Sequence, residues 1–249
     1  MGKVKKKLLC FLSLITLVSF NLNQMELLQV EGEENTQYGE SYRNHLAYSA
    51  KKGWNNDPNG LVYVNGTYHM YYQYNYDHRN DFTDIVWGNI SWGHATSSDL
   101  VHWEEQEVAL PAYQDVNGQH YAMMFSGSCV YDENNTSGLF NVKEDGSLQE
   151  GHGIVAILTQ PTDLQRQILV YSLDDGNSFN IYGEILSGNA EGSLGDNEFR
   201  DPKVFYSDEL NKWLMVIGGG SIRMYASDNL LNWSYLGETG YKKKVGRSK

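Results

Sequence analysis

Short apolar segments separated by turn-forming residues run through the chain from about residue 54 onward. Each segment is too short for a typical helix and is rich in β-branched and aromatic residues, so the pattern predicts antiparallel strands. The predicted hairpins pair 61–64 with 67–73, 154–158 with 168–172, and 203–206 with 212–217. Asn65-Gly66 favours a tight turn in the first hairpin. No long amphipathic helix is predicted, and the fold class is therefore all-β.

The strand pattern repeats along the chain. Asp57-Pro58 opens a hairpin that is followed by the segment 95–103, and Asp201-Pro202 opens one that is followed by the similar segment 226–233. Both segments read Ala-x-Ser-x-x-Leu-x-x-Trp or nearly so, and the copy between them places Phe179 where the others have Trp. A recurring four-strand unit with a late aromatic residue is typical of a β-propeller. Equivalent positions of successive blades converge on the central axis, so Asp57 and Asp201 are predicted to face one funnel.

The termini differ in composition from this repetitive part. Residues 1–24 combine a lysine-rich start with an apolar core at 8–20, which predicts a secretion signal, with an uncleaved N-terminal anchor as the alternative. Residues 25–41 are polar and acidic and are predicted to be a linker. Residues 42–240 form the predicted partial propeller, and 241–249 form a basic tail. The predicted location is therefore extracellular.

Charge and cysteine content exclude several classes of function. The formal net charge of −12 argues against nucleic acid or an anionic membrane as a partner. Of the two cysteines, Cys10 lies in the apolar N-terminal segment, and Cys129 is predicted to be a small buried strand residue. A single remaining thiol cannot form a disulfide framework or a cysteine-based zinc site. The histidines are scattered without metal-binding spacing, so neither a metal nor a cofactor is expected.

Two converging carboxylates with an arginine beside one of them, Arg200, point to sugar chemistry. A retaining glycosidase needs a carboxylate nucleophile and a carboxylic acid on either side of the bond that breaks. Aromatic faces can cover the apolar side of a sugar ring, while amides and carboxylates bind its hydroxyls.

Four motifs extend this interpretation. Trp-Asn-Asn-Asp-Pro-Asn-Gly at 54–60, the stretch 87–95, Phe-Ser-Gly-Ser at 125–128 and Phe-Arg-Asp-Pro at 199–202 follow one another in the order found in glycoside hydrolase family 32. Over roughly residues 42–235 the chain resembles this family of invertases, inulinases and levanases. The resemblance implies the N-terminal part of a five-bladed β-propeller that hydrolyses β-fructofuranosidic bonds in sucrose, levan or inulin.

The resemblance also implies roles for individual residues. Asp57 is expected to be the nucleophile, and Asp201 the carboxylate that stabilises the oxocarbenium-like transition state. Arg200 is expected to keep neighbouring carboxylates ionised, because a close cation lowers a carboxyl pKa. The remaining residues expected to bind substrate or line the pocket are Trp54, Asn56, Gln73, Trp87, Phe125 and Ser126. Taken singly, Trp87 and Phe125 would be read as core residues.

The sequence also departs from the family pattern. The Trp-Glu-Cys-Pro-like motif that carries the family's acid/base glutamate is not found, and Asn55 replaces the usual Met. The later blades and the C-terminal β-sandwich are likewise not found, so a truncated chain with impaired turnover is expected. Glu238 and Glu191 are the candidates for a substitute acid.

Two other hypotheses remain open at this point. The chain could be a non-catalytic fructan-binding fragment, or the product of a truncated pseudogene. It could instead be an inverting five-bladed glycosidase that acts on pentose polymers, although the four motifs favour family 32.

Overall fold

The computed structural model describes residues 47–76, 89–114, 121–141, 151–193 and 198–240. The chain divides into two compact units, Met1–Lys51 and Lys52–Lys249, and all that follows concerns the second. The predicted signal, linker and basic tail lie outside the described residues. No helix in the described part of the chain has the length and apolar character needed to cross a membrane.

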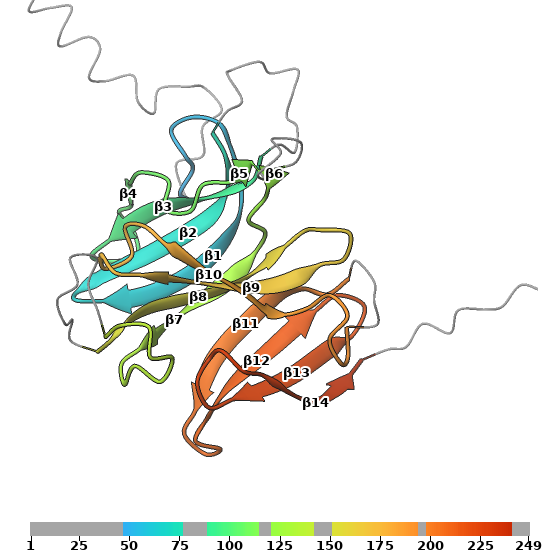
Figure 1. Ribbon diagram of the computed structural model, residues 1–249. Helices are drawn as coiled ribbons and strands as arrows, with labels where there is room; N and C mark the ends of the chain where they lie inside the picture. The colour runs from blue at the N-terminus through green and yellow to red at the C-terminus, as the bar shows by residue number, and fades with distance from the viewer. Residues whose placement is uncertain (1–46, 77–88, 115–120, 142–150, 194–197, 241–249) are drawn as a thin grey trace, which may run out of the picture. The chain divides into compact units, whose positions relative to one another are not determined.

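Three four-stranded antiparallel sheets make up the described part of the second unit (Figure 1). The first sheet contains β1 (Trp54–Val64), β2 (Thr67–Asn75), β3 (Ser91–Ser97) and β4 (Glu104–Glu105). The second contains β7 (Gly127–Asp132), β8 (Gly153–Gln160), β9 (Arg166–Ser172) and β10 (Asn180–Leu186). The third contains β11 (Arg200–Ser207), β12 (Lys212–Gly218), β13 (Ile222–Ser227) and β14 (Ser234–Thr239). The short β5 (Tyr113–Gln114) and β6 (Tyr121–Ala122) pair separately.

Each large sheet is built from strands that follow one another in sequence. This confirms the all-β class and the repeated four-strand unit, which is the arrangement that the predicted propeller requires. The predicted number of five blades remains a prediction. The hairpin turn at Asn65-Gly66 is also confirmed: both residues have positive φ, 49° and 85°, as a tight hairpin turn of mirror-image type demands.

The three sheets share a turn that identifies them as copies of one unit. The third strand of each ends on a serine whose Oγ accepts a hydrogen bond from the backbone N–H two residues later. The residue after that adopts a positive φ, which is uncommon for a residue other than glycine. The turns are Ser97–Leu100 (φ 66° at Leu100), Ser172–Asp175 (φ 57° at Asp175) and Ser227–Leu230 (φ 63° at Leu230). The sequence repeat is therefore also a structural repeat.

The two Asp-Pro strands are longer and more irregular than the sequence pattern predicts. β1 begins at Trp54, well before the predicted start at Leu61, so Asp57 lies inside the strand and not in the loop before it. The ladder between β1 and β2 shifts register on both sides of Pro58. β11 likewise shifts register near its beginning, where Asp201 lies. A proline cannot donate to a ladder, and bulges are where a strand accommodates one.

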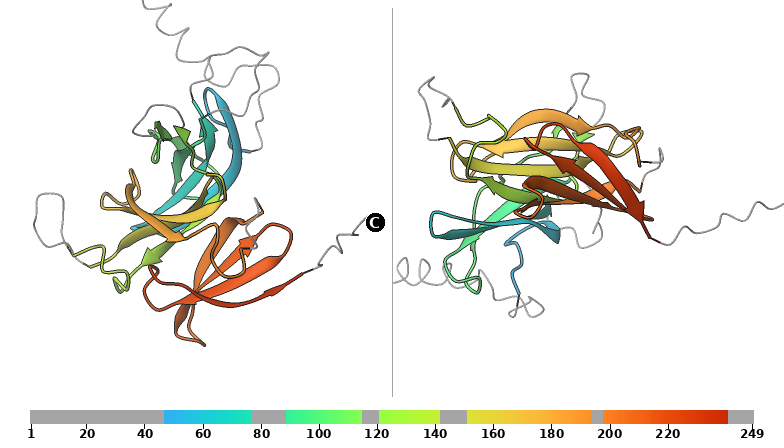
Figure 2. Two further views of the ribbon diagram at one scale, coloured as in Figure 1. Left: turned by 45° about the vertical axis from the view of Figure 1, so that its right-hand side comes forward. Right: turned by 90° about the horizontal axis from the view of Figure 1, so that it is seen from below.

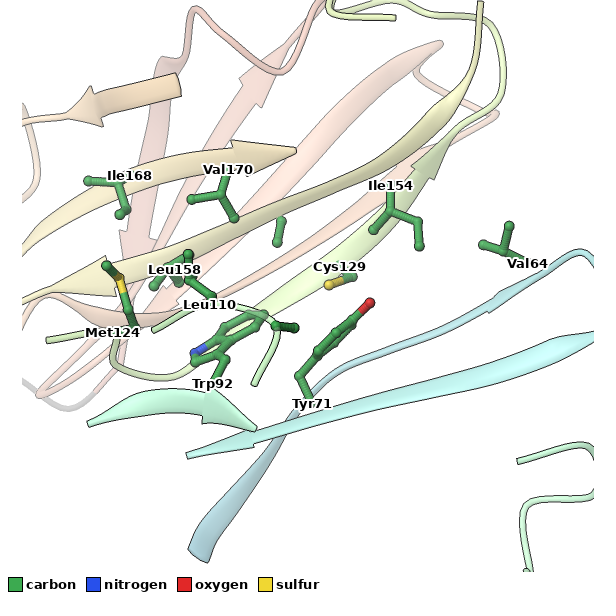
Figure 3. Packing of buried hydrophobic residues seen from close by; sticks show 12 residues of the cluster. Val64, Tyr71, Trp92, Leu110, Met124, Cys129, Ile154, Leu158, Ile168 and Val170 are labelled. Carbon is green, nitrogen blue, oxygen red and sulfur yellow. The ribbon is translucent and has the colours of Figure 1, made fainter. Parts of the chain in front are cut away.

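The core lies in two layers, one on each face of the second sheet. β8 is apolar on both faces: Ile154, Ala156 and Leu158 pack toward the first sheet, while Val155 and Ile157 pack toward the third. A strand covered on both faces has a nearly continuous apolar sequence, as this one does. Figure 3 shows the first layer, in which the rings of Trp92 and Tyr71 face the residues of the second sheet.

The first strands of the three sheets lie side by side. β7 contacts both β1 and β11, and the second sheet lies between the other two (Figure 2). Cys129 lies on β7 and is buried, as predicted. This arrangement brings the Asp-Pro motif of β1, the Phe-Ser-Gly-Ser motif before and within β7, and the Asp-Pro motif of β11 to one place.

Candidate active site

A cavity of about 360 Å³ opens where β1, β7 and β11 meet. Its lining comes in equal parts from three segments that are distant in sequence. Nine of the described residues line it: Asp57, Pro58, Asn59, Ser126, Gly127, Ser128, Asp201, Pro202 and Lys203. The two carboxylates that the repeat predicted to face one funnel therefore do share a cavity.

The carboxylate of Asp57 is oriented by a chain of hydrogen bonds. The Oγ of Ser126 donates to Asp57 Oδ2 at 2.7 Å. The Nε2 of Gln73 in turn donates to Ser126 Oγ, also at 2.7 Å. Gln73 is almost completely buried on β2, so its amide is fixed by packing. A hydroxyl that accepts one hydrogen bond and donates another to a carboxylate holds that carboxylate in one orientation.

Asp201 sits in a strained and charged environment. Its φ of 61° lies in the left-handed region, which a residue other than glycine seldom adopts. The Nε of Arg200 is 3.7 Å from Asp201 Oδ2, and the Nη2 of Arg200 is 3.0 Å from Glu198 Oε2. All three side chains remain substantially exposed. These contacts therefore orient the charged groups but add little to the stability of the fold.

Arg200 contributes to the charge balance at Asp201 in the direction expected for it. Partial burial raises the pKa of Asp201, Arg200 opposes this by lowering it, and the negative charges of Asp57 and Glu198 raise it further. Arg200 thus acts in the expected direction, but burial and the two neighbouring carboxylates outweigh it. The result is a carboxyl whose pKa lies above its ordinary value.

The other predicted residues are placed differently. Trp54 and Asn56 lie on β1 just before Asp57, and neither is among the described residues that line the cavity. Phe125 is half-buried next to Ser126, and its carbonyl accepts a hydrogen bond from the indole of Trp92. Trp87 lies outside the described residues. The structure therefore brings Asp57, Ser126 and Asp201 together, with Gln73 joined through Ser126 and Arg200 through Asp201.

Neither candidate for a substitute acid reaches the cavity lining among the described residues. The carboxylate of Glu238, on β14, accepts a hydrogen bond from Ser221 Oγ at 3.3 Å. The backbone carbonyl of Glu191 accepts one from the hydroxyl of Tyr225. Glu238 therefore contacts the connection between β12 and β13, and Glu191 lies in the connection between β10 and β11.

Sequence reasoning missed several residues of the cavity, including Asn59, Ser128 and Lys203. Asn59 and Lys203 each stand two residues after a predicted carboxylate, and alternate residues of a strand share one face. That spacing could have identified them. Among the described residues, no group of three His, Cys, Asp or Glu side chains could hold a metal ion.

The family model for the glycosyl hydrolases family 32 N-terminal domain matches residues 47–247. The chain belongs to this family. The match includes the three segments that form the cavity, so the resemblance inferred from the four motifs is confirmed.

Three members of family 32 illustrate the relationship. A fructan β-fructosidase of Streptococcus mutans is 44% identical over 79% of this chain, which spans 12% of that protein. An extracellular exo-inulinase of Aspergillus ficuum is 40% identical over 82% of this chain and 39% of its own length. The structure of a β-fructofuranosidase from Schwanniomyces occidentalis, complexed with fructosyl-erythritol, has a TM-score of 0.66 and 38% identity over 83% of this chain and 38% of that one. The chain thus spans well under half the length of these relatives.

Proposed function

We propose that this chain carries the fructosyl-binding and nucleophilic part of a retaining β-fructofuranosidase. The observation that supports this is the shared cavity, in which Asp57 and Asp201 converge from the first strands of two different sheets. Retaining glycoside hydrolysis uses a carboxylate nucleophile, and a second carboxylate at the same cavity can bind the hydroxyls of the sugar. Membership of family 32 makes the hydrolysis of fructans or sucrose the reaction class.

Each carboxylate has a separate task in the proposed mechanism. Asp57 attacks the anomeric carbon of a fructosyl unit and forms a covalent ester as the glycosidic C–O bond breaks. Ser126 holds Asp57 Oδ2, which fixes the direction of attack. Asp201 accepts hydrogen bonds from fructose hydroxyls, and these bonds strengthen as positive charge develops on the ring. The departing oxygen takes a proton from a general acid, and water then cleaves the ester.

The proposed substrates are sucrose and fructans such as inulin and levan. Relatives named as fructan β-fructosidase and exo-inulinase support a fructan as the substrate. A relative complexed with fructosyl-erythritol supports a fructosyl unit as the part that the pocket binds. We also propose secretion, supported by the lysine-rich and apolar segment at 1–24 and by the extracellular exo-inulinase. The net charge of −12 is compatible with an uncharged sugar partner.

The test separates the two carboxylates by their effects on binding and on turnover. Sucrose binding to the purified whole chain would be measured by calorimetry, and fructose release would be measured from sucrose, inulin and levan. Asp57→Ala is expected to abolish release but to keep sucrose affinity within a few-fold, since a nucleophile acts mainly in the bond-making step. Asp201→Ala is expected to weaken sucrose binding at least tenfold. Asp228→Ala, which removes an exposed carboxylate paired with Lys212, is the control and should change neither property.

Each outcome decides between specific alternatives. Release that persists in Asp57→Ala, or sucrose affinity that is unchanged in Asp201→Ala, would overturn the assigned roles. Binding without release by the unmodified chain would support the fructan-binding fragment. A folded chain that neither binds nor releases any of these sugars would overturn the proposal as a whole.

A further inference from the structure

The backbone around Asp201 lacks the regular support of a β-ladder. The register between β11 and β12 shifts just after Arg200, and Asp201 has a φ of 61°. A strained backbone persists only where its surroundings hold it in place. Its polar groups must also find partners outside the ladder if they are buried. The question is which groups provide this support.

The support comes from buried side chains of the second sheet. The N–H of Asp201 donates to Thr159 Oγ1 at 3.0 Å, and the same hydroxyl donates to Gln167 Oε1 at 2.8 Å. Gln167 Nε2 donates to the carbonyl of Phe199 at 2.7 Å. The N–H of Phe199 donates to Gln165 Oε1 at 3.1 Å. Every hydrogen bond in this network joins one donor to one acceptor, and the donors all point in the same direction along it.

These side chains are polar groups placed inside an otherwise apolar layer. Thr159 and Gln167 face each other across β8 and β9, both are 0% exposed, and Gln165 is 7% exposed. Burying a hydroxyl and two amides is unfavourable unless every group is paired. Here the partners include the backbone of Phe199 and Asp201. A fully satisfied buried network of this kind rigidifies what it holds.

Thr159 also supports the other side of the cavity. Its backbone N–H donates to the carbonyl of Ser126 at 3.1 Å, and its carbonyl accepts a hydrogen bond from the N–H of Phe125 at 2.9 Å. Ser126 is the residue that holds Asp57. The main chain of Thr159 therefore bonds to the backbone of Ser126, next to Asp57. Its side chain bonds to the backbone N–H of Asp201. Thr159 does not line the cavity itself.

We propose that Thr159, Gln165 and Gln167 form a polar clamp on the backbone around Asp201. Within this clamp Thr159 is a positioning residue: it holds the Asp201 carboxylate where it can bind the fructosyl hydroxyls. The inference rests on the proposed function, because that function gives Asp201 a sugar to hold. Loss of the Thr159 hydroxyl would release the Asp201 N–H and leave Gln167 Oε1 unpaired. The carboxylate would then no longer be held at the spacing from Asp57 that the substrate requires.

The test uses a pair of substitutions at Thr159 in the whole chain. Thr159→Val keeps the shape but removes the hydroxyl, and Thr159→Ser keeps the hydroxyl. Thr136→Val is the control: the Oγ1 of Thr136, in the connection after β7, also accepts a hydrogen bond from the third sheet, from Trp213 Nε1 at 2.8 Å, but it lies away from the cavity. Sucrose dissociation constants, thermal midpoints and the exchange rate of the Asp201 amide proton by NMR would be measured for each variant.

We expect Thr159→Val to raise the sucrose dissociation constant at least tenfold and to speed Asp201 amide exchange at least tenfold. Thr159→Ser should restore both to within about threefold of the unmodified chain, as a hydroxyl again pairs the same groups. Thr136→Val should lower the thermal midpoint without changing either quantity. Unchanged sucrose affinity in Thr159→Val, or an equal loss of affinity in Thr136→Val, would overturn the positioning role.

The amide exchange separates this inference from the proposed function, because it needs no ligand. If the unmodified chain binds no sucrose, the proposed function fails, and the exchange data alone then decide the clamp. If sucrose binds but Asp201 amide exchange is the same in Thr159→Val as in the unmodified chain, the clamp is wrong and the proposed function stands.

Discussion

Two buried histidines predict that the free energy of unfolding falls steeply in mild acid. The rings of His69 and His94 stack with centroids 5.3 Å apart, and His69 Nδ1 lies 3.1 Å from His94 Nε2. The pKa of His94 is lowered to about 4, chiefly by burial and also by the neighbouring His69, while Asp174 opposes the shift. Burial also lowers the pKa of His69, with Asp175 opposing. Both rings are therefore neutral in the folded chain near neutral pH.

The size of the effect follows from proton linkage. An unfolded histidine titrates near 6.5, so between that pH and about 4 the unfolded chain binds a proton that folded His94 does not. The contribution of His94 to stability is complete above pH 6.5 and is lost as the pH falls toward 4. The loss approaches about 1.4 kcal/mol per pH unit and totals about 3 kcal/mol for this residue.

Urea unfolding at several pH values between about 7 and 5 would measure this slope. His94→Gln removes the titrating ring but keeps an amide that can pair with His69. We expect the free energy of unfolding of the unmodified chain to fall more steeply with acid than that of His94→Gln, by roughly 1 kcal/mol per pH unit near pH 5. The comparison uses slopes, so a change in absolute stability caused by the substitution does not affect it.

His102 provides the control, since it is an exposed histidine that pairs with Asp99 at the surface. His102→Gln shows how much of any change in slope comes from replacing a surface histidine by glutamine. Parallel slopes for the unmodified chain and His94→Gln would refute the reasoning. They would show that burial does not hold the His94 ring neutral.

Three further substitutions test other parts of the structure. Ser126→Ala removes the 2.7 Å donor to Asp57, and because hydrogen bonds to charged groups contribute about 1.5–3 kcal/mol, sucrose turnover measured by kinetics should fall roughly tenfold or more. Arg223→Met strips buried donors from several backbone carbonyls, and urea unfolding should show a loss of about 3 kcal/mol or more. Gly60→Ala places a Cβ 2.6 Å from Cys129 Sγ at a φ of 52°, so the thermal midpoint should fall by several degrees or more.

Each of these substitutions has a control within the chain. Lys212→Met removes an exposed lysine paired with the exposed Asp228 and should cost less than about 1 kcal/mol. Gly66→Ala has positive φ but no atom within 4 Å of the new Cβ, so it should cost less than the change at Gly60. Equal losses within either pair would contradict the structural explanation. For Ser126→Ala, a thermal midpoint close to that of the unmodified chain would show that the lost turnover does not come from a loss of folding.

Local signals in the sequence were enough to predict one hairpin in each large sheet and the tight turn of the first hairpin. Residues such as Asn65-Gly66 specify a tight turn through their own backbone preferences. The repeated serine turn needs only neighbours within a few residues, and it marks the same position in every sheet. The boundaries were less accurate: β1 starts at Trp54 because bulges keep an Asp-Pro segment within the ladder, and bulges depend on the partner strand.

The site divides in the same way. Equivalent positions in a repeat converge, so Asp57 and Asp201 could be paired from the sequence alone. The part played by Gln73 could not be predicted, because its amide reaches Ser126 across 53 positions of sequence, and only the packing of β2 against the strands of the cavity sets that distance. The role of Thr159 was not predicted, because its contact with Asp201 spans 42 positions of sequence.

By itself the sequence determined the all-β class, the repeating unit, the family and the pair of carboxylates, because these depend on periodicity, turn chemistry and motif order. The tertiary structure alone decided the positive φ of Asp201, the buried network that holds it, the raised pKa of its carboxyl and the neutral histidine pair. These properties arise from groups far apart in the chain that share a low-dielectric interior. There, burial and exact partners set both geometry and charge.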